Sequence, residues 1–254
     1  MSGDLAAAYQ SGSQRARVVT EFWGQTNLYC ANCSSQSLRR LRNNTRASDF
    51  ACPDCGLWYQ LKCQQSCIGA SVADGAYGAM MDAVRRDQIP SFYFMQYEVT
   101  SWSVKNLLLI PHFAFPPSAI IKRKPLAPAA RRAGWVGCNI ALNRIPAEAR
   151  ISVVEEGTVA AEEAVRRQFQ NVKPLKKIPI AQRGWTLDML NAVRSLRTPT
   201  FSTRDAYSLV PVLQALHPGN RHVREKLRQQ LQVLRDAGFL IQTGRGGWRL
   251  AESE

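Results

Sequence analysis

Two pairs of cysteines share one internal spacing. Cys30 and Cys33 form the first pair, Cys52 and Cys55 form the second, and 18 residues separate them. Two tight turns that each offer two thiolates are typical of a tetrahedral zinc site. Because four thiolates fill the coordination sphere, we expect a structural zinc ion. No comparable pairing is found for the three remaining cysteines, to which we assign no chemistry: Cys63, Cys67 and Cys138.

The second cysteine pair lies between an aspartate and a lysine. Asp49 precedes this pair on an expected strand, and Gln60 and Lys62 follow it on another. The strand-like runs at 47–51 and 57–63 predict a hairpin that brings these side chains together. Alternate residues of a strand share a face, so Gln60 and Lys62 point the same way. An aspartate, a second oxygen ligand and a lysine can support phosphodiester hydrolysis with Mg²⁺.

The spacing of Asp49 and Gln60-Leu61-Lys62 resembles the PD-(D/E)xK motif of nucleases. The whole chain resembles the DpnI-like methyl-directed (type IIM) restriction endonucleases of that superfamily. Beside the cysteine pairs and this motif, four segments carry the resemblance: SVADGAYGAMM at 71–81, IIKRKPLAPAARRAGWVGCNI at 120–140, RGWTLDMLN at 183–191 and REKLRQQLQVLRD at 224–236.

The resemblance implies a Mg²⁺-dependent nuclease that cleaves duplex GATC sites bearing methyladenine. It implies that Asp49 and the Leu61 carbonyl are the main metal ligands and that Lys62 acts at the attacking water. The family's second acidic residue falls on Gln60, whose amide oxygen can bind a cation but brings no negative charge. We therefore expect Gln60 to be a neutral ligand and Mg²⁺ binding to be weaker. Glu21, on an expected first helix, is a candidate to compensate.

A helix expected over 220–237 is a candidate DNA reader. Val223, Leu227, Leu231 and Leu234 form one apolar stripe on it. With helices at 186–196 and 203–216 and a glycine-rich hairpin at 239–250, it predicts a winged helix whose reading helix enters the major groove. The alternative is a solvated helix face. The side chains suited to hydrogen bonds with base edges are Arg221, Arg224, Arg228, Gln229 and Gln232.

A basic loop over 122–137 places Trp135 close to Arg131 and Arg132. An aromatic ring near arginines suits contact with bases and phosphates, and the resemblance implies that Trp135 senses the adenine methyl groups. The alternative is a tryptophan that anchors the loop to the core. Burying a methyl group in a shaped pocket is worth only about 1–3 kcal/mol. We therefore expect the loop and the winged helix each to prefer methylated DNA.

The charge of the chain predicts a polyanionic partner. Lys and Arg total 33 against 19 Asp and Glu, a formal net charge of +14. Nucleic acid is the first candidate and an anionic membrane the second. No apolar run approaches the roughly 20 residues that span a bilayer, and no export leader is recognised, so we expect a cytoplasmic protein. The sequence does not indicate any protein partner.

Two domains are expected. Residues 1–182 predict an α/β nuclease core of the restriction-endonuclease type, with a mixed sheet, the zinc knuckles and a basic linker at 171–182; residues 183–254 predict the winged helix. Within the core we expect helices at 5–23, 76–86 and 158–169, the last capped by Thr158. We expect strands at 91–99, 106–111, 138–142 and 151–154.

Two other functions compete with restriction cleavage. A catalytically inactive methyl-DNA-binding protein or transcription regulator with a degenerate nuclease site is supported by Gln60. An RNA-processing nuclease suits the charge but does not suit a winged helix.

Overall fold

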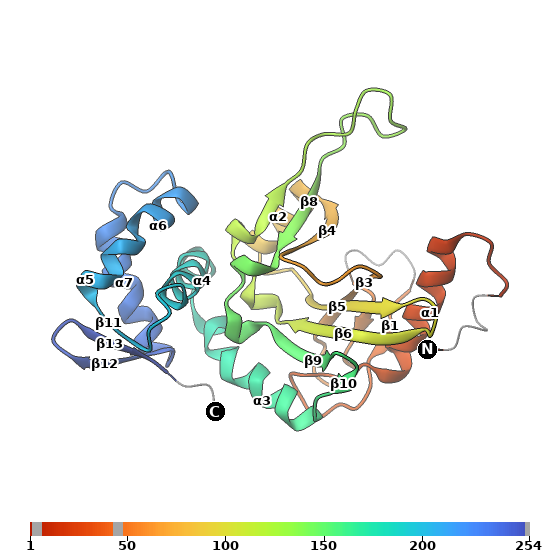
Figure 1. Cartoon of the computed structure of the whole chain (residues 1–254), viewed down its shortest axis with the longest axis horizontal. Helices are drawn as coiled ribbons and strands as arrows, with labels where there is room; N and C mark the ends of the chain where they lie inside the picture. Colours follow the sequence, from red (N-terminus) through yellow and green to blue (C-terminus); the bar gives the residue numbers. More distant parts are fainter. Residues whose placement is uncertain (2–6, 43–47, 252–254) are drawn as a thin grey trace. The chain divides into compact units, whose positions relative to one another are not determined.

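A computed structural model describes residue 1 and residues 7–42 and 48–251. Residues 5 and 6 of the expected first helix and residue 47 of the expected hairpin lie outside these ranges. The chain divides into two compact units (Figure 1). Unit 1 comprises residues 1–69, 89–112 and 149–170, and unit 2 comprises residues 70–88, 113–148 and 171–254.

Unit 1 is built on a seven-stranded sheet in the order β1-β2-β3-β5-β6-β9-β10. Strands β3 and β5 are parallel and the other neighbours are antiparallel, so the predicted mixed sheet is confirmed. The strands are β1 (Arg39–Arg40), β2 (Phe50–Ala51), β3 (Trp58–Gln64), β5 (Ser91–Glu98), β6 (Ser103–Ile110), β9 (Ile151–Glu155) and β10 (Thr158–Val159).

Strand β5 runs through the core of this sheet. Phe92, Tyr93, Phe94 and Met95 are consecutive and almost fully buried, the pattern of a strand covered on both faces. Helix α1 (Gly12–Asn27) packs closely on β2 and β3. Gly24 permits this, because a Cβ there would lie 2.8 Å from the ring of Phe50.

The helix expected from Thr158 begins later, so Thr158 does not cap it. Helix α3 spans Glu162–Val172, whereas Thr158 lies in β10, which pairs with β9. Glu156 and Gly157 both adopt positive φ, at 45° and 82°, and form the tight turn between the two strands. The chain therefore adds one more strand before the helix. The first turn of α3 contains two glutamates, whose negative charges interact favourably with the positive end of the helix dipole.

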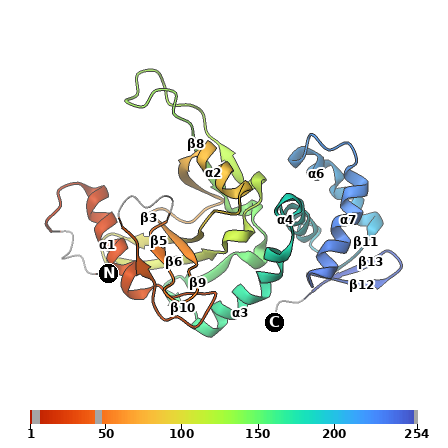
Figure 2. The ribbon, with the colours of Figure 1, turned by 180° about the vertical axis from the view of Figure 1, so that it is seen from behind.

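The first part of unit 2 is a three-stranded antiparallel sheet in the order β4-β8-β7. Its strands are β4 (Ser71–Ala76), β7 (Ile120–Lys122) and β8 (Gly137–Ala141), and helix α2 (Tyr77–Arg85) follows β4 directly. The basic loop of residues 123–136 joins β7 to β8 and extends outward from this sheet (Figures 1 and 2).

The C-terminal part of unit 2 is the predicted winged helix. The helix expected over 203–216 is interrupted by a 3-10 turn at Tyr207–Leu209, and Pro211 stands in the first turn of the helix that follows. The elements are α4 (Ile180–Arg194), α5 (Thr203–Ala206), α6 (Val210–Leu216), α7 (Val223–Asp236) and a sheet of β11 (Thr200–Ser202), β13 (Gly247–Leu250) and β12 (Leu240–Gly244).

The segment 171–182, expected to be a basic linker, has regular structure over much of its length. Residues Lys173–Lys177 form a 3-10 turn, and α4 already begins at Ile180. Leu175 is fully buried and Ile178 nearly so, which anchors a segment that looked polar because of its lysines and prolines. The domain boundary at residue 183 stays a prediction, and α4 runs through it.

Helix α4 is fixed within unit 2 by polar side chains. A Cβ on Gly184 would lie 2.9 Å from Pro117, so this glycine also allows a close approach. The partners belong to segments 70–88 and 113–148 and to His217, which follows α6. These contacts join the first helix of the winged helix to the part of unit 2 that holds the sheet with the basic loop. The contacts are Arg183 with Asp87, Asp188 with Ser118 and His217, and Arg194 with Glu148.

No helix among the described residues is both long enough and apolar enough to cross a membrane.

Candidate functional site

The four cysteines of the two pairs converge in unit 1. Their Sγ atoms all lie within 4.8 Å of one another. The Sγ atoms of Cys30 and Cys55 are 3.6 Å apart, and those of Cys33 and Cys52 are 3.5 Å apart. Zinc–sulfur bonds of about 2.3 Å require sulfur atoms of a tetrahedron to be about 3.8 Å apart. The cluster therefore has the composition and spacing to hold a zinc ion.

The surroundings of Cys52 favour ionisation of its thiol. Burial alone would raise its pKa, but the backbone N–H groups of Cys55 and Asp54 donate to the sulfur and lower the pKa to about 7. A zinc ligand must be a thiolate, so these donors favour the form that binds metal.

Arg166, on α3, holds the first cysteine turn. Its Nε donates to the carbonyl oxygens of Cys30 (3.1 Å) and Cys33 (3.0 Å), and Nη2 donates to that of Ser35 (3.3 Å). Its guanidinium also lies over the ring of Tyr29. The sequence analysis missed this residue, because nothing in the local pattern of a helix shows that one arginine reaches a turn more than 130 residues earlier.

Tyr59 connects the cysteine cluster to β3. Its hydroxyl accepts from the N–H of Ala31 at 3.2 Å and lies 3.2 Å from the Sγ of Cys30. The ring is fully buried and stacks on Tyr93 of β5. The residue just before Gln60 is therefore fixed from two sides.

Asp49 directly precedes β2 and lies beside β3. Its N–H donates to the Tyr59 carbonyl (2.9 Å), and its Oδ2 accepts from the N–H of Leu61 (2.8 Å). The side chain thus continues the pairing that the backbone of β2 begins. This confirms the predicted hairpin and fixes the carboxylate against the strand that carries Gln60 and Lys62.

Charged groups surround the Asp49 carboxyl. Burial raises its pKa above the ordinary 3.8, and the charge of Glu21 raises it further, whereas the Leu61 N–H, Lys62 and Arg17 act in the opposite direction. Lys62 and Glu21 therefore lie within electrostatic reach of Asp49. A partly buried carboxylate with a raised pKa is stabilised when a cation binds beside it.

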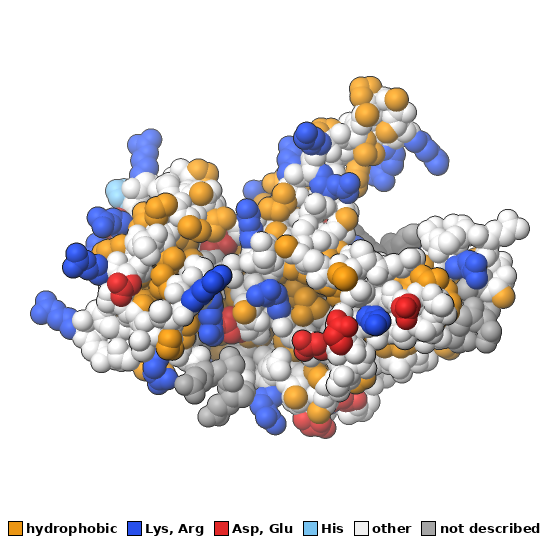
Figure 3. Space-filling model, viewed as in Figure 1, with side chains coloured by type: hydrophobic (Ala, Val, Ile, Leu, Met, Phe, Trp, Pro, Cys, Tyr) orange, Lys and Arg blue, Asp and Glu red, His pale blue; other side chains and the backbone are white. Residues whose placement is uncertain are grey.

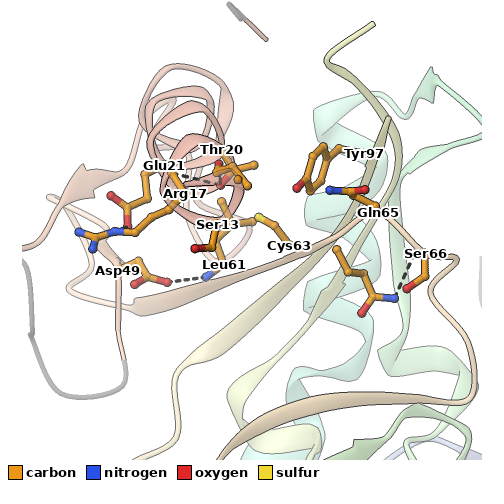
Figure 4. Close-up of a pocket in the computed structure, with 13 residues that line it drawn as sticks. Ser13, Arg17, Thr20, Glu21, Asp49, Leu61, Cys63, Gln65, Ser66 and Tyr97 are labelled. Carbon is orange, nitrogen blue, oxygen red and sulfur yellow. Dashed lines mark hydrogen bonds and ion pairs between the residues drawn. The ribbon is translucent and has the colours of Figure 1, made fainter. Parts of the chain in front are cut away.

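A cleft of about 600 Å³ opens beside Asp49 (Figure 4). Arg17 and Glu21 of α1 line it together with Leu61 and Cys63 of β3, and it extends to Tyr97 of β5. Glu21, the candidate compensating carboxylate, is in this cleft.

Gln60 and Lys62 share one face of β3 and are half-buried, while Tyr59 lies on the other face. In register with β5, Gln60 lies beside Phe92 and Lys62 beside Phe94. Of the predicted site residues, Leu61 hydrogen-bonds to Asp49 and Lys62 lies within electrostatic reach of it. Gln60 lies on the same face of β3 as Lys62.

Helix α7 buries the predicted stripe of Val223, Leu227, Leu231 and Leu234. Gln230 is also fully buried and accepts from the Thr186 hydroxyl of α4 at 2.6 Å, a contact that the apolar periodicity could not indicate. Of the predicted reading residues, Arg221 is exposed but precedes the helix, which begins at Val223. The other four predicted reading residues lie on the helix itself and are exposed: Arg224, Arg228, Gln229 and Gln232.

Trp135 packs against its own loop. The Arg132 guanidinium lies 4.8 Å from the Trp135 ring centre, and a Cβ on Gly137 would be 2.8 Å from the ring. The Leu126 N–H donates to the Trp135 carbonyl, which closes the base of the loop. The ring is half-exposed, whereas Arg131 and Arg132 are exposed. Basic side chains gather over this loop and over the winged helix (Figure 3).

The fold comprises a mixed α/β unit with a four-cysteine cluster and a C-terminal helix-turn-helix domain. Comparison with protein families agrees with this class. Residues 1–178 match the DpnI family, described as the Dam-replacing family, and residues 181–250 match the Dam-replacing HTH domain. The chain belongs to this Dam-replacing family, whose members are DpnI-like methyl-directed restriction enzymes.

Loss of a cysteine ligand should remove the metal and destabilise unit 1. We expect about one zinc per purified chain. Cys52→Ser should lose it and lower the melting temperature by at least about 10 °C, because zinc binding contributes directly to folding. Elemental analysis and thermal unfolding measure both effects. Cys67→Ser, an exposed cysteine outside the cluster, is the matched control. Equal zinc content and stability in both variants would refute the assignment.

Proposed function

We propose that this chain is a Mg²⁺-dependent endonuclease that hydrolyses phosphodiester bonds of duplex DNA at adenine-methylated GATC sites. The observation that carries the proposal is the position of Asp49. Its carboxylate is bound to the backbone of Leu61 within electrostatic reach of Lys62, at the edge of a cleft. Membership of the Dam-replacing family supports the same reaction.

The donor atoms around Asp49 suit a hard cation. The carboxylate has one oxygen beyond the one that accepts from Leu61, and the Leu61 carbonyl and the Gln60 amide supply further neutral oxygens. When bound, Mg²⁺ would stabilise charge on the phosphate and lower the pKa of a bound water. The raised pKa of Asp49 fits this role, because burial disfavours the charged carboxylate unless a cation lies beside it.

The other groups have distinct roles in this proposal. Lys62 orients the attacking water and offsets negative charge near the phosphate. Gln60 is a neutral ligand, so the site attracts Mg²⁺ less strongly than it would with a second acid.

DNA reading is assigned to unit 2. Exposed Arg224, Arg228, Gln229 and Gln232 of α7 would contact base edges in the major groove, with Arg221 at the start of the helix. Trp135, with Arg131 and Arg132, would contact methylated bases and phosphates. The winged-helix domain is proposed to begin near residue 183.

A methyl-DNA reader that does not cut is the second candidate. Gln60 favours it, because the loss of one carboxylate is a common way for a metal site to decay. Both candidates bind the same DNA, so only a cleavage assay separates them.

Plasmid cleavage tests the reaction itself. With Mg²⁺, we expect plasmid methylated at GATC adenines to be cut and unmethylated plasmid to stay intact. Asp49→Ala should slow cutting about a hundredfold or more, because it removes the only charged ligand proposed for the metal. Gel analysis over time measures both. Binding without cutting by the unchanged protein would establish the reader instead.

Gln60→Glu tests the neutral ligand. A second carboxylate should lower the Mg²⁺ concentration for half-maximal cutting about tenfold, equivalent to about 1.4 kcal/mol of cation binding. Mg²⁺ titration of the initial cleavage rate measures this shift. Gln64→Glu, on the same strand face, is the matched control. A Mg²⁺ requirement in Gln60→Glu that is no lower than in Gln64→Glu would show that Gln60 is not a ligand.

Trp135→Ala tests methyl sensing by the loop. The ratio of affinities for methylated and plain GATC duplexes, measured without Mg²⁺, should fall about tenfold but stay above one, because α7 would keep its own preference. Trp58→Ala is the control, since Trp58 is 50% exposed and belongs to unit 1. An unchanged ratio would assign Trp135 to loop packing alone.

A further inference from the structure

Two short basic segments of unit 2 meet at one buried arginine. The Arg183 side chain, in the first turn of α4, is only 8% exposed, and its Nη1 contacts Oδ1 of Asp87 at 2.6 Å. Its Nη2 donates to the carbonyl oxygens of Lys176 (3.0 Å) and Ile178 (3.1 Å). One guanidinium therefore holds the end of α2 against the 3-10 turn that precedes α4.

The packing of this 3-10 turn leaves two lysines in solvent. Leu175 is fully buried and Ile178 nearly so, whereas Lys176 and Lys177, which lie between them, are exposed. The apolar side chains thus fix the backbone while the lysine side chains stay outside. Lys173, at the start of the turn, has an interaction of its own and is not grouped with these two.

Two arginines are exposed at the end of α2. Val84 is buried in the helix, and the chain leaves the helix at Asp87, whose φ is 56°. Arg85 and Arg86, between these residues, are exposed. Because Asp87 is bound by Arg183, the end of α2 and the 3-10 turn lie next to each other. We call the four exposed cations of the two segments the junction patch: Arg85, Arg86, Lys176 and Lys177.

The junction patch keeps an excess of positive charge after the acids of its two segments are counted. Segments 82–88 and 173–183 contain six Lys or Arg and two Asp. Asp87 is paired with Arg183, so only Asp82, which is exposed on α2, remains against the four patch cations. Within the described part of the chain, the four patch side chains form neither an ion pair nor a hydrogen bond.

The position of the junction patch within unit 2 points to duplex DNA. Helix α2 directly follows β4 of the sheet that carries the basic loop, and the 3-10 turn leads into α4, the first helix of the winged helix. The patch therefore lies where two parts with a proposed role in DNA reading are joined. Exposed lysines and arginines without acidic partners suit the closely spaced negative charges of a nucleic-acid backbone.

We propose that the junction patch binds backbone phosphates of the duplex that the reading elements contact, independently of base sequence and methylation. The identity of the ligand rests on the proposed function. Phosphate contacts position a protein on DNA but carry no sequence information. The patch would therefore supply affinity, whereas the basic loop and α7 would supply the preference for methylated sites.

The experiment measures binding of the full-length chain to methylated and to plain GATC duplexes without Mg²⁺. The patch variant combines Arg86→Ala and Lys176→Ala, one from each segment. The matched control combines Arg167→Ala and Lys105→Ala, which remove one exposed arginine and one exposed lysine from unit 1. An exchange variant, Arg86→Lys with Lys176→Arg, keeps both charges of the patch.

The patch variant should weaken binding to both duplexes about tenfold near 0.1 M salt and reduce the slope of log Kd against log salt by about two. The ratio of affinities for methylated and plain duplexes should change less than about twofold, because phosphate contacts do not read bases. The control and the exchange variant should each bind within about twofold of the unchanged chain. Thermal unfolding and zinc content verify the fold of each variant.

Three results would overturn the junction patch as a phosphate site. The first is a loss of affinity no larger than that of the control, and the second is a loss confined to the methylated duplex. The third is binding of the unchanged chain to phosphatidylserine vesicles that the patch variant loses while its DNA binding is unchanged, which would assign the patch to a membrane surface.

The binding result does not depend on cleavage. If the unchanged chain binds methylated plasmid without cutting it while the patch variant loses affinity, the nuclease proposal fails and the phosphate site stands. If the chain cuts methylated plasmid while the patch variant binds like the control, the phosphate site fails and the nuclease proposal stands. A chain that binds neither duplex would overturn both.

Discussion

The contact between Tyr59 and the first cysteine turn sets the position of β3, the strand on which the proposed nuclease site is built. The Tyr59 hydroxyl meets the N–H of Ala31 and the sulfur of Cys30, and its ring is stacked on β5. The next residues of the same strand are Gln60, Leu61 and Lys62. A metal ion bound by the four cysteines would therefore affect the reaction only indirectly. It would hold the first cysteine turn in place, and a shift of this turn would move β3. Arg166 reinforces this constraint from α3 by holding the carbonyls of the same turn.

Chemistry and DNA reading are assigned to different units of the chain. Asp49 and Lys62 belong to unit 1, whereas Trp135 and α7 belong to unit 2. Within unit 2, α4 connects the two reading elements, because its side chains contact both α7 and the segments around the small sheet. A buried arginine and a buried aspartate take part in these contacts, and such groups are costly to leave unpaired. Within unit 2, the sheet that carries the basic loop and the winged helix are thus joined through α4.

Local patterns predicted the parts of the site that depend on short stretches of chain. The spacing of the cysteines and the hairpin from Asp49 to Lys62 are set by residues close in sequence, and both were predicted. The predicted start of α3 was wrong because Gly157 allows a turn that adds a strand. The composition of 171–182 also gave no indication that Leu175 and Ile178 are buried among its lysines. The contacts of Arg166 and Gln230 and the ion pair of Arg40 with Glu21 join elements that are distant in sequence. Periodicity and composition contain no information about these contacts.

Glutamine at position 60, where the family motif has an acid, changes the charge that the proposed site offers. The charges of Lys62 and Arg17 already act on the Asp49 carboxyl and lower its pKa. A glutamate at position 60 would add a negative charge on the same strand, whereas glutamine adds none. Without that charge the site attracts a divalent cation less strongly and repels the phosphate backbone less, and the two effects act on different steps. Because the phosphate itself brings negative charge to the site, a cation can bind more readily after DNA than before it. The order in which DNA and Mg²⁺ bind would then follow from a single amide in place of a carboxylate.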